Sequence, residues 1–190
     1  MTEGSDTTFW LNYNSKKINI LNLISPNSNE NFIRISGSSA NFALELSEKS
    51  NKIYFYTYAG KCNTKNKSEK FIKIFELTDK QIKEIRLLID TLNINGISSD
   101  KFIENWEKGF DGISYLIEIK QDNNYSFKHY WSPHFQKNCN EAIIIQNFIN
   151  ELNKIIDYQN CRKKFISEIP FDCYSIGMIY TIKAKKHKKR

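Results

Sequence analysis

The sequence predicts an α+β fold, with a mostly antiparallel β-sheet and two main helices packed on one face of the sheet. Three observations predict this class. Several strand-like runs follow one another directly, two segments carry apolar residues at helical spacing, and one pair of strands reads as a hairpin. Strands that cluster, instead of alternating strictly with helices, favour an α+β arrangement.

The N-terminal 30 residues are polar and rich in Asn and Ser, so we expect an irregular extension there. A short apolar stretch at 18–24 is a candidate first strand, ended by the turn-forming cluster at 25–29. A length of 190 residues suggests one domain, which we place at 31–182. A basic tail at 183–190 follows it.

The next part of the chain predicts four strands. Each run is rich in β-branched or aromatic residues and is bounded by turn-forming or hydrophilic residues. The four runs are 31–36, 41–47, 53–59 and 71–77. The hydrophilic segment 60–69 reads as a loop.

Two segments predict the main helices. Thr78 and Gln81 form a capping box that begins a helix over about 79–93, and Asn95-Gly96 ends it. A second helix is expected over 141–157, where isoleucine, phenylalanine and leucine form a broad apolar stripe. A short helix is expected at 100–107.

The segment 113–131 predicts a β-hairpin whose register follows from its pattern. A three-residue loop at 122–124 places apolar residues of the two strands opposite each other. In that register Tyr115 faces Trp131 and Glu118 faces Lys128, and the charge match supports the pairing. After this hairpin and the second main helix, a basic link at 161–164 leads to two more expected strands, at 165–169 and 174–182.

The net charge of +7 is concentrated at one end of the chain. The tail 183–190 holds six positive charges, and without them the net charge falls to +1. Nucleic-acid-binding domains usually carry their basic residues on a folded face. The tail therefore either binds phosphates loosely or serves as a solubilising end.

The sequence shows no feature of a membrane protein. No apolar run approaches the roughly 20 residues that span a bilayer, and the first residues lack the pattern of a signal peptide. No Cys-x-x-Cys pair occurs, and Cys139 and Cys161 lie at opposite ends of the second predicted helix. We expect reduced thiols, no metal, no cofactor and a cytoplasmic protein, with a secreted or periplasmic form that has lost a leader as the alternative.

The sequence offers few candidates for catalysis. It contains neither a nucleophile elbow nor a phosphate-binding glycine loop. His129, His134 and Cys139 have no known metal-ligand spacing, and His129 reads as a sheet residue. Asp111 precedes a strand within an Asp-Gly turn pair, and no second carboxylate lies at a defensible distance.

The candidate binding residues are aromatic. Tyr54, Tyr56 and Tyr58 alternate along one strand and form a row on one of its faces. An exposed row would stack on bases or sugars or form a protein interface, whereas a covered row would serve packing. Trp131 joins this set, although the Pro at 133 also makes it a natural strand end.

The motifs DGISYLIE, YWSP and EAIIIQNFINEL resemble small uncharacterised bacterial α+β proteins with a DG-x-x-Y strand, a Y-W-x-P exit and a following helix. The resemblance covers about 71–180 and implies a compact domain without a known activity.

Three functions remain as hypotheses. The leading one is a non-catalytic bacterial binding protein, such as an immunity or accessory protein, that acts through a protein interface. The second is a nucleic-acid or nucleotide binder that uses the tyrosine row and the basic tail. The third is an enzyme with an unrecognised site around Asp111, His129 and His134.

Overall fold

The computed structural model describes residues 5–38, 41–61, 68–109, 111–122, 124–176 and 179–182. It confirms the α+β class. The helices are α1 (Ser5–Leu21), α2 (Asp79–Thr91), α3 (Asn140–Ile155) and α4 (Tyr158–Glu168). The strands are β1 (Phe32–Gly37), β2 (Phe42–Ser47), β3 (Asn51–Gly60), β4 (Glu69–Glu76), β5 (Ser114–Gln121), β6 (Asn124–Trp131), β7 (Cys173–Ile176) and β8 (Ile179–Ile182).

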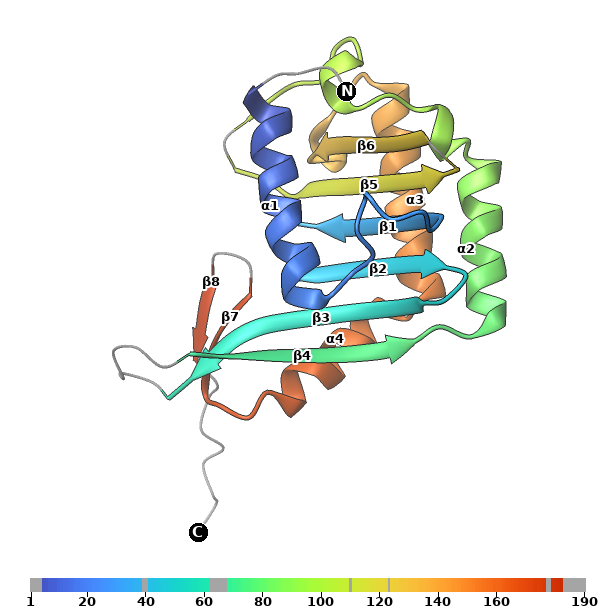
Figure 1. The fold of residues 1–190 in the computed structure, drawn as a ribbon. Helices are drawn as coiled ribbons and strands as arrows, with labels where there is room; N and C mark the ends of the chain where they lie inside the picture. The colour runs from blue at the N-terminus through green and yellow to red at the C-terminus, as the bar shows by residue number, and fades with distance from the viewer. Residues whose placement is uncertain are drawn as a thin grey trace.

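All strands belong to one antiparallel sheet with the order β6-β5-β1-β2-β3-β7-β8. β4 pairs with the opposite side of β3, where it forms an edge of the sheet. One face of the sheet carries α1, and α2, α3 and α4 lie on the other face (Figure 1). The sheet is therefore covered on both sides.

The larger core lies between the sheet and α2, α3 and α4. It is built from alternate strand residues such as Ile35 and Phe55 and from the apolar stripes of the helices, including Ile85, Phe148 and Phe165. Both helices predicted for this face are present, and the capping box at Thr78 and Gln81 is formed. The periodic apolar pattern predicted them because the core takes up only one side of each helix.

The N-terminal segment differs from its prediction. Residues 5–21 form α1, so the region is not irregular, and 18–24 contributes the end of this helix instead of a strand. The buried side of α1 includes Asn14 and Lys17, which are 2% and 1% exposed. Amphipathic helices are predicted from apolar residues at helical spacing, and polar residues on the packed side of α1 interrupt this pattern.

The C-terminal segment also differs. The expected strand at 165–169 falls mostly in α4, which is held by stacking of Phe165 on Phe55 and Phe71. The expected strand at 174–182 is two strands, because β7 and β8 pair as a hairpin. Met178 and the tail 183–190 lie outside the described residues.

The β5–β6 hairpin is present, but its predicted register is wrong by one residue. Tyr115 pairs with Tyr130 instead of Trp131, and Glu118 pairs with Phe127 instead of Lys128. The prediction assumed that one face of the hairpin is apolar. Because helices cover both faces, β5 and β6 carry buried residues on each side, and the pattern no longer selects one register.

The region 94–107 contains less helix than expected. It contains two 3-10 turns, η1 (Ile94–Gly96) and η2 (Asp100–Phe102), instead of a helix over 100–107. Its side chains instead protect the outer edge of β6. Ser99 Oγ bonds to both backbone groups of His129 at 3.1 Å, and Asp100 Oδ2 accepts a bond of 2.8 Å from the Trp131 amide.

Two observations concern the environment of the protein. None of the described helices combines the length and apolar character that crossing a membrane requires. Cys139 and Cys161 are free, as their separation predicted. Cys173 takes part in a disulfide, which corrects the expectation that every thiol is reduced.

Candidate functional site

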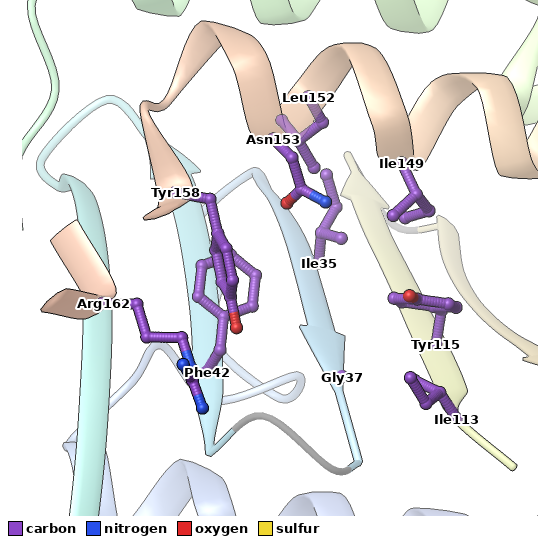
Figure 2. A pocket seen from close by; sticks show the side chains of 10 residues that line it. All are labelled: Ile35, Gly37, Phe42, Ile113, Tyr115, Ile149, Leu152, Asn153, Tyr158 and Arg162. Atoms are coloured by element: carbon purple, nitrogen blue, oxygen red, sulfur yellow. The ribbon is translucent and has the colours of Figure 1, made fainter. Parts of the chain in front are cut away.

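A pocket of about 250 Å³ lies between the sheet and the helices α3 and α4. Strands β1, β2 and β5 supply one wall, and α3 and α4 supply the other (Figure 2). A water molecule occupies about 30 Å³ of liquid, so this volume suits one small organic molecule. A drug-sized ligand needs a larger pocket, of roughly 300–1,000 Å³.

The floor of the pocket is apolar. Its side chains come from β1, from β2, from the residue before β5 and from the buried stripe of α3, and they are Ile35, Phe42, Ile113, Ile149 and Leu152. Phe42 is fixed by an edge-to-face contact with Tyr158, whose ring centroid lies 5.4 Å away. Except for Ile113, these residues belong to the main core, where side chains are closely packed.

The rim of the pocket is polar. Tyr115, Asn153, Tyr158 and Arg162 line it, and all four are half-buried. Figure 2 shows Asn153 directed from α3 toward the strands and Arg162 directed from α4 past Tyr158. Among the described residues, no hydrogen bond or ion pair forms at any of these four side chains.

The two tyrosines of the rim are hydrogen-bond donors at neutral pH. Burial raises the pKa of Tyr115. Burial also raises the pKa of Tyr158, and Tyr115 adds to this effect while the positive charge of Arg162 opposes it. Both hydroxyls therefore keep their protons, and together with the Arg162 guanidinium and the Asn153 amide they present donors around an apolar floor.

The predicted tyrosine row lies elsewhere, beneath α1. Tyr54 and Tyr56 are 5% and 7% exposed and pack with Leu21 and Leu23 in a second, smaller core, whereas Tyr58 is 42% exposed. The condition for stacking on bases or sugars, an exposed row, is not met at Tyr54 and Tyr56. Binding by Tyr58 remains a prediction.

Trp131 is held by close packing. A Cβ atom at Gly109 or Gly112 would lie 2.4 Å or 2.8 Å from its ring, so the indole packs against the bare backbone of both glycines. Its carbonyl accepts a bond of 2.9 Å from the Trp106 indole. These contacts explain the residue as a structural element, and its predicted role in binding is untested.

Among the described residues, no hydrogen bond or ion pair joins the proposed enzyme residues Asp111, His129 and His134 to one another. Asp111 and His134 are exposed. His129 Nδ1 lies 2.8 Å from Asp100 Oδ2, and its Nε2 lies 2.9 Å from Ser114 Oγ.

This Ser114–His129–Asp100 chain has the hydrogen-bond order of a serine hydrolase triad. Its serine, however, is 3% exposed. The Trp10 ring of α1 stacks on the imidazole at 4.6 Å, and the Ser114 amide donates to Ser38 Oγ instead of pointing into an oxyanion hole. We therefore interpret these three hydrogen-bonded side chains as a structural link between β5, β6 and η2.

The sheet face beneath α1 also buries a charge network. Arg34 is fully buried between Glu45 and Glu118, with nitrogen–oxygen distances of 2.8 Å and 3.0 Å. Tyr125 donates a bond of 2.7 Å to Glu118, and the Arg34 guanidinium also bonds to the Ile24 carbonyl. The network leaves no ionised group of this trio unpaired.

Sequence reasoning missed the pocket because its residues are distant along the chain. Tyr115 and Leu152 were expected in a hairpin and a helix stripe, and Arg162 was expected in a basic link. Residues 161–164 lie within α4, a helix that the sequence analysis did not predict. This helix places Arg162 beside the strands.

No protein-family model, curated protein or solved structure matches this chain. Among the described residues, no group of three or more His, Cys, Asp or Glu side chains is arranged to hold a metal ion.

Proposed function

We propose that this protein is a non-catalytic binding protein that holds a small amphipathic anion in the pocket between the sheet and α3 and α4. One observation carries the proposal. Four polar side chains that have no hydrogen-bond or ion-pair partner in the described part of the chain surround the mouth of an apolar pocket. Ligand sites combine an apolar lining with a few convergent polar groups in this way.

The polar groups favour a negative ligand. Arg162 carries a permanent charge, and its two-pronged guanidinium matches a carboxylate. Tyr115 and Tyr158 add hydroxyl donors beside it. Lys163 and Lys164 follow on α4 and raise the local positive potential.

The apolar floor selects the rest of the ligand. Ile35, Phe42 and Leu152 are almost fully buried and offer only carbon surface to the pocket. A carboxylate with a short aliphatic or aromatic body satisfies both the floor and the rim. Phenylacetate and hexanoate are suitable probes of this class.

The test compares each acid with its neutral amide by NMR titration of the full chain. We expect phenylacetate to bind with a dissociation constant of roughly 0.1–10 mM, as for a fragment-sized ligand. Phenylacetamide, which lacks the charge, should bind more weakly. Shifted resonances should include Tyr115, Leu152 and Tyr158.

Arg162→Gln is the decisive variant. Loss of a charge-assisted hydrogen bond should weaken phenylacetate about 10- to 100-fold and leave phenylacetamide unchanged. Lys163→Gln removes the same charge from an exposed neighbouring position and serves as the matched control. Equal effects of the two variants, or shifts that map outside the pocket, would contradict the proposal.

A protein interface remains the second candidate function. The observation that favours it is the outer edge of β4, since within the described ranges this strand pairs with β3 alone. An open strand edge is a common site for strand addition by a partner.

The compartment is part of the proposal. The disulfide at Cys173 supports an oxidising compartment over the cytoplasm expected from the sequence.

A further inference from the structure

β6 and β4 are two of the edge strands of the sheet, and their outer edges differ in how they are covered. The outer edge of β6 is sealed, because Ser99 and Asp100 bond to backbone groups of His129 and Trp131. The outer edge of β4 has no such cover among the described residues. Ile74, near the C-terminal end of β4, is 47% exposed.

The direction of the free backbone groups follows from one hydrogen bond. The Leu77 amide donates to the Asn51 carbonyl at 3.0 Å, directly beyond the Lys52–Glu76 pair of the β3–β4 ladder. Backbone groups alternate in direction along an antiparallel strand. The backbone amide and carbonyl groups of the odd-numbered residues of β4 therefore point toward β3. Those of the even-numbered residues point outward, and these residues are Lys70, Ile72, Ile74 and Glu76.

We propose that β4 pairs antiparallel with β4 of a second copy of this chain, with the two-fold axis at Lys73. In this register Ile72 lies opposite the partner's Ile74, and Lys70 lies opposite the partner's Glu76. Apolar and opposite-charge pairs directly across a ladder stabilise it. The partner is a second copy because the strand is complementary to itself.

The alternation of backbone groups restricts the register. An axis between two residues would place outward groups opposite inward ones, and no ladder would form. An axis at Ile72 would place Lys70 opposite Ile74, and an axis at Ile74 would place Glu76 opposite Ile72. Only the axis at Lys73 matches charge with charge and apolar with apolar.

The structure also tolerates the one unfavourable contact of this pairing. Lys73 would face the partner's Lys73, but its Nζ already lies 2.6 Å from Glu168 Oε2 in its own chain. Four facing pairs of outward residues would exchange about eight backbone hydrogen bonds. Pairing would also cover the exposed side chain of Ile74.

A cysteine cross-link tests the register. Residue 73 faces itself as a non-hydrogen-bonded pair with Cα atoms about 4.5 Å apart, which permits a disulfide. Lys73→Cys should give a covalent dimer on mild oxidation of the full chain. Ile72→Cys is the matched control, because its nearest copy lies roughly 7–8 Å away on the diagonal.

The wild-type chain, oxidised in parallel, accounts for cross-links through its native thiols. Failure of Lys73→Cys to cross-link above this background, or equal cross-linking of Ile72→Cys, would overturn the proposed register.

Sedimentation equilibrium tests the pairing itself. The wild-type chain of 22.4 kDa should show about twice this mass at high micromolar concentration. Ile74→Pro removes an outward amide and no bond to β3, so it should fold and sediment as a monomer. A wild-type monomer, or a dimer unchanged by Ile74→Pro with native circular dichroism, would overturn the proposal.

Discussion

Arg34 and Glu118 lie directly opposite each other in the β1–β5 ladder, and Arg34 Nη1 donates bonds of 3.0 Å to both oxygens of the carboxylate. Both side chains are fully buried. Arg34→Met would remove the ion-pair partner that both Glu118 and Glu45 contact directly, while the two carboxylates stay buried. We expect this change to reduce the free energy of unfolding by about 3–5 kcal/mol, measured by urea denaturation.

An exposed ion pair provides the control for this prediction. Lys49 lies 3.1 Å from Glu30, and its side chain is 79% exposed. Lys49→Met should change stability by less than about 1 kcal/mol. A similar loss in both variants would show that burial of Arg34 is not what makes its ion pairs important.

Lys17 predicts a pH-dependent stability. Burial lowers the pKa of this lysine to about 8, with a smaller opposing effect of Glu118 and a smaller supporting effect of Arg34. Its Nζ has no hydrogen-bond partner among the described residues. Lys17→Met should therefore stabilise the protein at pH 7, by about 3 kcal/mol if the whole shift is realised.

The sign of the pH dependence follows from the two pKa values. Between about pH 8 and pH 10.5 the unfolded chain keeps the Lys17 proton and the folded chain has lost it, so wild-type stability rises with pH. Below pH 8 the full penalty is present. The tyrosines with raised pKa values lower the stability as the pH rises above about 10. Because wild type and Lys17→Met both contain these tyrosines, their effect cancels in the difference in stability between the two proteins. A constant difference between wild type and Lys17→Met from pH 7 to pH 10 would contradict this prediction.

The contrast between α2 and α1 shows what the sequence could predict. In α2 the buried residues Ile85 and Ile89 repeat at helical spacing, and Thr78 begins the helix with its cap. In α1 the buried side includes Asn14 and Lys17, so the same reasoning finds no period. A helix that packs on a polar sheet face is not visible to a rule based on apolar residues.

The pocket was unpredictable for a related reason. Ile113 and Arg162 are far apart in sequence, and only the turn between α3 and α4 brings the arginine to the strands. The four expected strands between 31 and 77 and the two strands of the hairpin are present, because their β-branched and aromatic residues are bounded by clear turns. The strands expected at 18–24 and 165–169 were wrong. The hairpin register failed because Glu118 pairs with Arg34, a residue outside the hairpin.

Asp100 is expected to stabilise the edge of β6. Its Oδ2 accepts bonds of 2.8 Å from the Trp131 amide and from His129 Nδ1. Asp100→Ala would leave both donors without this acceptor, and we expect a loss of about 2 kcal/mol in the free energy of unfolding. Asp111→Ala, at an exposed position, should change stability by less than about 0.5 kcal/mol. Equal effects in chemical denaturation would argue against a role of Asp100 in sealing this edge.

The hydroxyls of two tyrosines differ in role: one stabilises the fold, and the other is available to a ligand. Tyr130 is fully buried, and its hydroxyl donates a bond of 3.1 Å to the Ile97 carbonyl. Tyr130→Phe should therefore reduce the free energy of unfolding by about 1–2 kcal/mol, because that carbonyl loses its partner. Tyr158 has the same chemistry but no hydrogen-bond partner among the described residues.

Tyr158→Phe keeps the ring contacts with Phe42 and Phe55 and removes only the hydroxyl. We expect stability to stay within about 0.5 kcal/mol of wild type, while phenylacetate binding weakens by about threefold to tenfold. Thermal unfolding and NMR titration of the same samples measure both effects. A marked loss of stability with unchanged binding would assign this hydroxyl to the fold, whereas the opposite result requires that the hydroxyl contacts a ligand.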